Sequence, residues 1–162
     1  MDILIFITVG SQLTFDRLLK AVDKEIEAGN IKDQVIVQGG KTKFKSKNMK
    51  IIKFLELDEF EKYIKDADLI ISHGGVGSII DALKYNKTVI ATPRLKKYKE
   101  ALNDHQIQII ENFGIEGYII PLLDLKELDL ALEKAKTFKP KKYKSNTSNM
   151  VKLIEDYIDK ED

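Results

Sequence analysis

A glycine-rich stretch in the middle of the chain combines the residue types that can hold a phosphate group. Residues 69–83 read LIISHGGVGSIIDAL, so an apolar run ends in His73, three glycines and a serine before an amphipathic segment begins. This order predicts a buried strand that turns directly into a helix, whose first backbone N–H groups lack partners within the helix. These groups and the positive end of the helix dipole form an anion site, which glycine lets a ligand approach closely. We expect a phosphate group to be held here by His73, Gly74, Gly75, Gly77 and Ser78.

Two other nucleotide-binding patterns fit this stretch less well. The spacing differs from the G-x-G-x-x-G fingerprint of dinucleotide-binding domains, and the stretch lies in mid-chain instead of after the first strand. No Gly-Lys-Ser/Thr follows, which excludes a P-loop. A tight strand-to-helix connection without a ligand is the remaining alternative.

Composition describes an ordinary water-soluble domain. The chain has 162 residues, enough for one domain with a proper core, and its formal net charge of +1 gives no general attraction to nucleic acid. It has no cysteine, which excludes disulfides and thiolate metal sites and fits a reducing compartment. The first residues lack the basic start of a signal peptide, and no apolar run is long enough to span a bilayer. We therefore expect a cytoplasmic protein that is at most peripheral to a membrane.

Lysines gather in three clusters along this nearly neutral chain. They lie between residues 41 and 53, between 94 and 99 (with Arg94), and between 139 and 144. Each cluster is either a solvated loop or a contact for anionic lipid headgroups or a partner, to which each lysine would contribute about 1 kcal/mol.

Short apolar runs alternate with amphipathic segments along the chain. The expected strands are residues 3–9, 35–38, 51–55, 69–72, 88–91 and 117–120. The expected helices are 15–28, a segment capped by Asp58, 75–85, a segment capped by Asp104 that runs through 113, 125–137, and a last amphipathic helix between 150 and 158. This alternation predicts an α/β fold of one domain, with a doubly wound, mainly parallel six-stranded sheet in the order 3-2-1-4-5-6.

Polar residues follow several of these strands at the end where ligands bind in such sheets. Beyond His73 and its glycines, they include Gly10 and Ser11, then Arg94, and finally Asp104, His105 and Gln106. Asp104, His105 and Gln106 could bind sugar hydroxyls, and Asp81, one turn into the expected phosphate helix, could accept a hydrogen bond from a ribose. The histidines lack the spacing of a metal site, and we see neither a Ser/His/Asp triad nor paired carboxylates. We expect no metal and no cofactor.

The chain resembles the C-terminal, donor-binding half of GT-B glycosyltransferases of family 28. It is most similar to the small soluble subunits of split enzymes, both eukaryotic ones acting on dolichol-linked oligosaccharide and bacterial ones of capsule and exopolysaccharide synthesis. The matching segments are 6–11 (FITVGS), 15–18 (FDRL), 37–40 (VQGG), 67–78 (ADLIISHGGVGS), 93–98 (PRLKKY) and 103–106 (NDHQ). They span nearly the whole chain, and the last three point to the bacterial branch.

The resemblance implies a Rossmann-like half of a GT-B fold and assigns roles to individual residues. His73, Gly74, Gly75 and Ser78 would bind the donor diphosphate, with Gly10 and Ser11 approaching from the first strand. Asp81 stands where relatives carry a glutamate that binds the uridine ribose, so its reach is shorter by one methylene. Asp104 and Gln106 match an acidic-plus-Gln pair that binds the transferred sugar. The resemblance leaves the catalytic base unassigned on this chain, and His105 is a candidate.

The implied reaction transfers a hexose or N-acetylhexosamine from a UDP-sugar to a lipid-linked acceptor in surface polysaccharide biosynthesis. The chain would be a hexosyltransferase active with a membrane-anchored partner subunit that supplies the acceptor site and recruits it to the inner face of the plasma membrane. Arg94, Lys96 and Lys97 are candidate contacts to that partner or to the acceptor. We assign residues 1–140 to the nucleotide-sugar-binding domain, and 141–162 to a C-terminal amphipathic helix that packs on it or on the partner. Alternatives are a non-catalytic nucleotide-sugar-binding regulatory module and, less favoured, a standalone dinucleotide-dependent enzyme.

Overall fold

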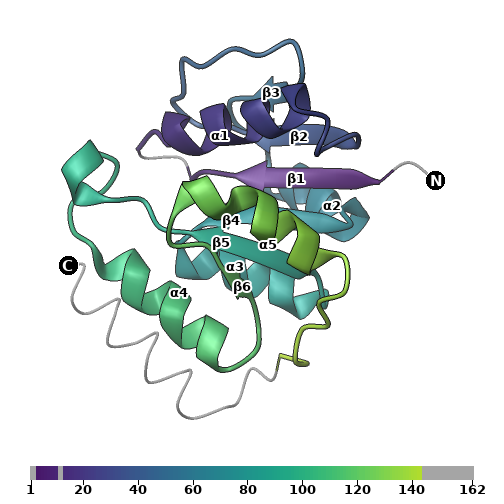
Figure 1. The fold of residues 1–162 in the computed structure, drawn as a ribbon, viewed down its shortest axis with the longest axis vertical. Helices are drawn as coiled ribbons and strands as arrows, with labels where there is room; N and C mark the ends of the chain where they lie inside the picture. The colour runs from purple at the N-terminus through teal and green to yellow at the C-terminus, as the bar shows by residue number, and fades with distance from the viewer. Residues whose placement is uncertain (1–2, 11–12, 144–162) are drawn as a thin grey trace.

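The structure, a computed structural model, describes residues 3–10 and 13–143 (Figure 1). Its strands are β1 (Leu4–Thr8), β2 (Gln34–Gln38), β3 (Lys50–Ile52), β4 (Leu69–His73), β5 (Thr88–Thr92) and β6 (Ile120–Pro121). Its helices are α1 (Asp16–Glu27), α2 (Leu57–Asp66), α3 (Val76–Lys84), α4 (His105–Ile115) and α5 (Leu128–Ala135), with short 3₁₀ turns η1 (Lys96–Tyr98) and η2 (Leu125–Glu127). Within the described ranges, no helix is long and apolar enough to cross a membrane.

The predicted fold class and strand order are confirmed. The six strands form one sheet in the order β3-β2-β1-β4-β5-β6, and every neighbouring pair is parallel. The order reverses between β1 and β4, where Thr8 is the register partner of Ser72. The carboxyl ends of these two strands are therefore adjacent, and the segments that follow them diverge to opposite sides of the sheet.

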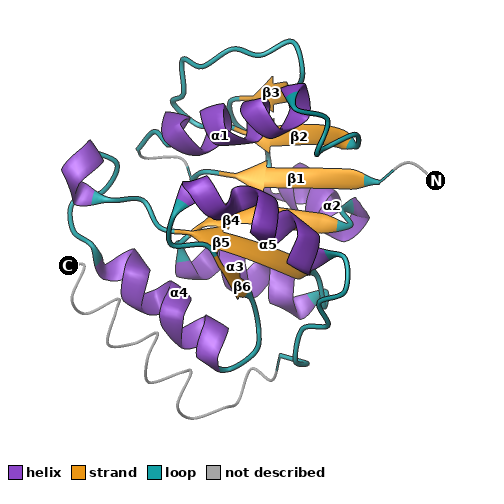
Figure 2. Ribbon diagram, viewed as in Figure 1, coloured by secondary structure: helices purple, strands orange, loops and turns teal. Residues whose placement is uncertain are grey.

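Helices cover both faces of the sheet (Figure 2), which explains why its central strands carry apolar side chains on both faces. Ile5 and Ile7 of β1 belong to the core under α1 and α5. Phe6, between them, belongs to the opposite core under α2, α3 and α4. Successive side chains of a strand point to opposite faces, so one strand contributes to both cores and is fixed from two sides.

The crossover from β2 to β3 contains no helix. In its place an extended segment, residues 41–48, runs along α1; we call it the strap. Thr42 Oγ1 donates to Asp16 of α1, and Asn48 Nδ2 donates to Asp23 Oδ1 over 3.0 Å. The polar sequence predicted this loop, but its attachment to a helix far away in the chain was not predicted.

Several element boundaries differ from the prediction. The third and sixth strands are shorter than expected, because they pair only over Lys50–Ile52 and Ile120–Pro121. Asp58 does not cap α2: Glu56 occupies the cap position and Asp58 lies in the first turn. The expected helix 125–137 is a 3₁₀ turn followed by the shorter α5. The last predicted helix lies outside the described residues, and the domain boundary at residue 140 stays a prediction.

Candidate functional site

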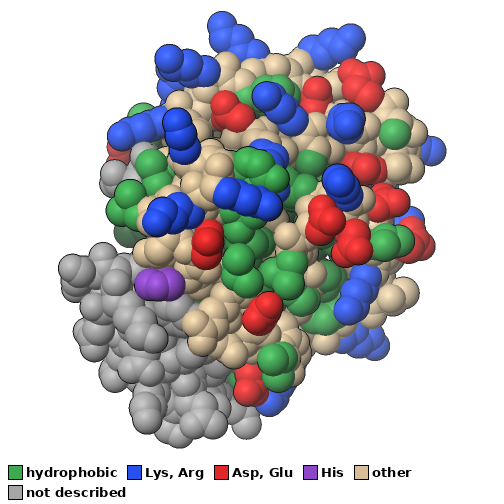
Figure 3. Space-filling view, turned by 60° about the vertical axis from the view of Figure 1, so that its left-hand side comes forward, with side chains coloured by type: hydrophobic (Ala, Val, Ile, Leu, Met, Phe, Trp, Pro, Cys, Tyr) green, Lys and Arg blue, Asp and Glu red, His purple; other side chains and the backbone are tan. Residues whose placement is uncertain are grey.

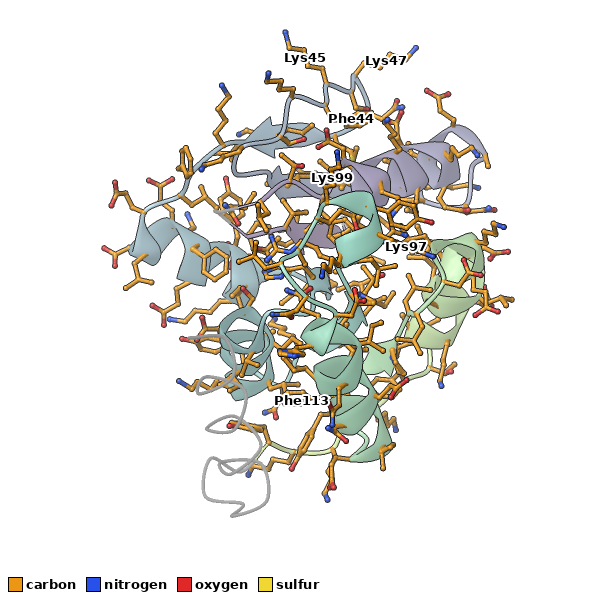
Figure 4. The ribbon with its side chains drawn as sticks, turned by 90° about the vertical axis from the view of Figure 1, so that its left-hand side faces the viewer. Phe44, Lys45, Lys47, Lys97, Lys99 and Phe113 are labelled. Carbon is orange, nitrogen blue, oxygen red and sulfur yellow. The ribbon has the colours of Figure 1, made fainter. Side chains whose placement is uncertain are left out.

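Three strand ends converge at the carboxyl edge of the sheet, as the sequence predicted. The edge faces the viewer in Figure 4. Gly10 follows β1 with a φ of 82°, a backbone conformation that favours glycine. A Cβ atom added there would lie 3.1 Å from Nε2 of His73, at the end of β4, and 3.3 Å from a guanidinium nitrogen of Arg94, after β5. Ser11, which was predicted to approach the diphosphate together with Gly10, lies outside the described residues.

His73 is a buried, neutral histidine. Its side chain is enclosed where β4 ends, and the residue is 6% exposed. Burial, and to a smaller extent the positive charge of Arg94, lower the pKa of His73 to about 3. The imidazole is therefore uncharged at neutral pH, so that it can donate a single ring N–H to a ligand but contributes no positive charge.

Gln106 connects the ends of β4 and β5 to His73. Its Oε1 accepts hydrogen bonds from the backbone N–H groups of Gly74 (3.2 Å) and Arg94 (2.9 Å). With the oxygen so occupied, the amide nitrogen faces Nδ1 of His73 at 3.4 Å. An amide nitrogen only donates, so Nδ1 must accept and the ring proton resides on Nε2. The donor N–H of His73 is thus directed to the Gly10 side of the edge.

The first turn of α3 is open to a ligand. Gly75 precedes the helix, and a Cβ atom there would collide with the His73 ring. A Cβ atom at Gly77 would meet nothing within 4 Å, and Ser78 is partly exposed beside it. The backbone at the helix N-terminus is therefore accessible, as anion binding requires. Gly74 has a packing role as well, because a Cβ atom there would lie 2.6 Å from Cβ of Gln106.

The predicted sugar-binding residues lie on α3 and at the start of α4, and they differ in burial and in hydrogen-bond partners. Asp81 lies one turn further along α3 and lines a hollow of about 360 Å³ between α2 and α3. Asp104 precedes α4, but its carboxylate accepts from the backbone N–H of Lys96 (2.9 Å) in place of the expected helix N–H groups. The backbone N–H of His105 donates to Asn103 (3.0 Å). Gln106 is buried, with its amide engaged as described above, so sugar contact through that amide would require these bonds to rearrange.

Arg94 differs from the expectation for a docking cation. It is 9% exposed, and its guanidinium donates to the carbonyl oxygens of Val9 (3.3 Å) and Leu13 (3.2 Å). These two bonds brace the loop after β1 against the loop after β5. They also provide acceptors for the guanidinium, which would be costly to bury without them. Lys96 and Lys97 are exposed, as a contact to a partner requires.

A half-buried ion pair that the sequence did not suggest fixes the loop after β5. The guanidinium of Arg17, in α1, donates to both carboxylate oxygens of Glu100 at 3.0 Å. Glu100 is 5% exposed and also accepts from the backbone N–H of Leu95 (3.1 Å). Arg17 lies in the motif FDRL, but Glu100 follows a run of lysines and carries no recognisable signal.

Metal coordination finds no support in the described part of the chain. Residues 3–10 and 13–143 contain no group of three or more histidine, aspartate or glutamate side chains that could hold a metal ion. The groups that this edge offers to a ligand include the backbone N–H groups of the first turn of α3 and the neutral ring N–H of His73.

The chain is similar to known glycosyltransferase sequences. Residues 4–160 match the model of the glycosyltransferase family 28 C-terminal domain. The UDP-N-acetylglucosamine transferase subunit ALG13 of Candida albicans is 36% identical over 69% of this chain, and that of Saccharomyces cerevisiae is 33% identical over 56%. The alignments cover 36% and 40% of these two relatives.

Solved structures share the fold at low sequence identity. A solution structure of ALG13 superimposes with a TM-score of 0.62 and 20% identity, covering 94% of each chain. MurG of Acinetobacter baumannii gives a TM-score of 0.59 at 18% identity, covering 96% of this chain and 50% of that one. At this identity, the superpositions establish the architecture and nothing further.

Proposed function

Because the chain belongs to glycosyltransferase family 28, as its match to the C-terminal domain of that family shows, we propose that it is the donor-binding subunit of a two-component glycosyltransferase. It binds a UDP-sugar and takes part in transferring a hexose or N-acetylhexosamine to a lipid-linked acceptor in surface polysaccharide synthesis. The two yeast relatives described above are named as UDP-N-acetylglucosamine transferase subunits. This favours N-acetylglucosamine among the sugars.

The observation that carries the proposal is the open N-terminus of α3 at the switch point between β1 and β4. A diphosphate placed there meets the backbone N–H groups of the first turn, the Ser78 hydroxyl and the Nε2–H of His73. The negative charge that develops on the leaving diphosphate is stabilised by these fixed donors and by the helix dipole, so the reaction needs no metal. Gly77 leaves space for the ligand beside the first turn, because a Cβ atom there would meet nothing within 4 Å.

The acceptor and the catalytic base come from a membrane-anchored partner in this proposal. His73 is unsuited to the role of base, because its low pKa makes it a weak proton acceptor and its Nδ1 faces Gln106. The exposed residues at the carboxyl edge, including Lys96, Lys97 and Tyr98, offer a surface for such a partner. The partner recruits the chain to the inner face of the plasma membrane, where the lipid-linked acceptor resides.

Calorimetry with UDP tests the donor site. His73→Ala and Ser78→Ala should each weaken UDP binding by about 1–3 kcal/mol, the worth of a hydrogen bond to a charged group. Thr137→Ala is the matched control, because it removes an exposed hydroxyl beyond α5 and should leave UDP affinity unchanged. Unchanged affinity in both site variants would refute the assignment. Ser78→Ala remains informative even if the buried His73 variant fails to fold.

A donor screen tests the reaction itself. UDP-glucose, UDP-galactose and UDP-N-acetylglucosamine are supplied with a lipid-linked acceptor, with and without the co-expressed membrane partner. We expect one of the three donors to support transfer, and we expect that transfer to require the partner. Binding of a UDP-sugar without transfer in either case would identify the chain as a regulatory module.

A further inference from the structure

The strap presents its lysines along one outward side. Residues 41, 43, 45 and 47 are all lysines and all exposed, whereas the intervening residues 42, 44, 46 and 48 are buried or half-buried. Figure 4 shows Lys45 and Lys47 pointing away from the body, while Phe44 lies inward. Phe44 packs against the core under α1. An extended segment alternates its side chains in this way, so lysine at every second position forms one row.

The inward side of the strap is fixed to α1 by side-chain hydrogen bonds. Ser46 and Asn48 both donate to the carboxylate of Asp23, and these bonds lower the pKa of Asp23. Asn48 Nδ2 also lies 2.8 Å from Glu27 Oε1. The neutral groups of the strap thus occupy the nearby carboxylates. In the described ranges, the ion pairs within 4.0 Å involve none of the strap lysines.

Positive charge is concentrated here in a protein that is otherwise acidic. Residues 39–55 contain six lysines and no acidic residue, so the rest of the chain carries a formal net charge of −5. In Figure 3, lysine and arginine side chains (blue) gather along the top of the molecule, the end at which Figure 4 shows Lys45 and Lys47. Such a separation of charge would orient the molecule on a negatively charged plane with the strap toward it.

A hollow lined by lysines and by apolar side chains lies beside the strap. It has a volume of about 640 Å³ and is lined by Lys43, Lys45 and Lys53 together with Phe44, Met49 and Ile51. The three ammonium groups suit a phosphate, and the apolar side chains suit the upper part of an acyl chain. The combination of both chemistries in one place is typical of a contact with an amphiphile.

We propose that the strap is a docking surface for anionic phospholipid headgroups. From residue 41 to residue 47 an extended chain reaches roughly 20 Å, enough to contact several headgroups at once. A bilayer surface is favoured over nucleic acid on two grounds. The strap contains lysine but no arginine, the residue that binds nucleic-acid phosphates in bidentate fashion. Its aromatic residue, Phe44, faces inward and offers no platform for stacking a base.

The experiment is flotation of the full chain with lipid vesicles, without any partner protein. Vesicles of phosphatidylcholine with phosphatidylglycerol are compared with vesicles of phosphatidylcholine alone. The strap variant is K41Q/K43Q/K45Q/K47Q. Each lysine near an anionic surface strengthens binding about five-fold, so we expect the variant to bind at least 100-fold more weakly. Binding of the wild-type chain should also fall steeply in 0.5 M salt, because exposed charges are screened.

The matched control removes the same charge elsewhere. K62Q/K84Q/K126Q/K134Q replaces four exposed lysines on other elements and should retain wild-type binding. Equal binding of the two variants, no binding of the wild-type chain to anionic vesicles, or equal binding to neutral vesicles would each overturn the proposal. Tighter binding to a DNA or RNA oligonucleotide than to anionic vesicles would overturn it in favour of a nucleic-acid surface. UDP affinity, measured in parallel, should be unchanged in the strap variant, so this result is independent of the donor site.

Discussion

Lowering the pH from 7 to 5 should destabilise the protein through His73. In the folded chain the pKa of His73 is about 3, first because of burial and second because of Arg94. In the unfolded chain the pKa returns to about 6.5. Between these values the unfolded state binds more protons, so stability falls with falling pH across the window from 6.5 to 3. The resulting loss between pH 7 and pH 5 is about 2 kcal/mol of unfolding free energy.

Urea unfolding of three proteins isolates this contribution. The wild-type chain, His73→Asn and His105→Asn are unfolded at both pH values. Carboxylates and other groups titrate in all three, so the difference between the pH-dependent losses reports the replaced histidine. We expect His73→Asn to lose about 2 kcal/mol less than the wild-type chain on acidification. His105→Asn is the matched control, because His105 is the only other histidine of the chain and is partly exposed.

The result that would refute the reasoning is an equal loss in the wild-type chain and in His73→Asn. It would mean that His73 is protonated in the folded chain at pH 5, and that the site carries a positive charge in that range. An NMR titration gives a second, direct reading, since only two histidine side chains contribute signals. We expect one of them to stay neutral down to pH 5, with its proton on Nε2.

Three further predictions concern Gln106, Gly77 and Arg17. Gln106→Leu leaves the buried N–H groups of Gly74 and Arg94 without their acceptor and should cost about 2–6 kcal/mol of unfolding free energy. Gln106→Glu keeps the acceptor and should therefore cost less. The added carboxylate should also raise the pKa of His73, which an NMR titration measures. Gly77→Ala should stabilise α3 by up to about 1 kcal/mol in urea unfolding and yet weaken UDP binding, because its methyl group occupies the open side of the first turn; unchanged UDP affinity would argue against a ligand there. Arg17→Ala leaves the carboxylate of Glu100 buried without its partner and should cost about 3 kcal/mol in urea unfolding; a loss below 1 kcal/mol would contradict a structural role for the pair.

The strand order and the glycine turn were predictable from local sequence. Continuous apolar runs such as Leu69–His73 are typical of strands covered on both faces, and the alternation with helices restricts the topology to a few arrangements. Boundaries at the edges were less predictable. The third strand ends earlier than predicted and the sixth begins later, because pairing with a neighbour, not the apolar run, decides which residues form a strand.

The sequence by itself determined the fold class, the family and the position of the glycine-rich strand-to-helix turn, because each follows from local patterns and short motifs along the chain. Tertiary structure alone decided which way side chains face and what they bind. Arg94 looked like part of a basic surface cluster, but the segments after β1 surround it and use its donors. Gln106 accepts hydrogen bonds from the backbone N–H groups of Gly74 and Arg94, which follow two different strands. Glu100 pairs with an arginine that is 83 residues away in the chain. Such partners meet only when the sheet is assembled, and the burial that makes each bond obligatory exists only then.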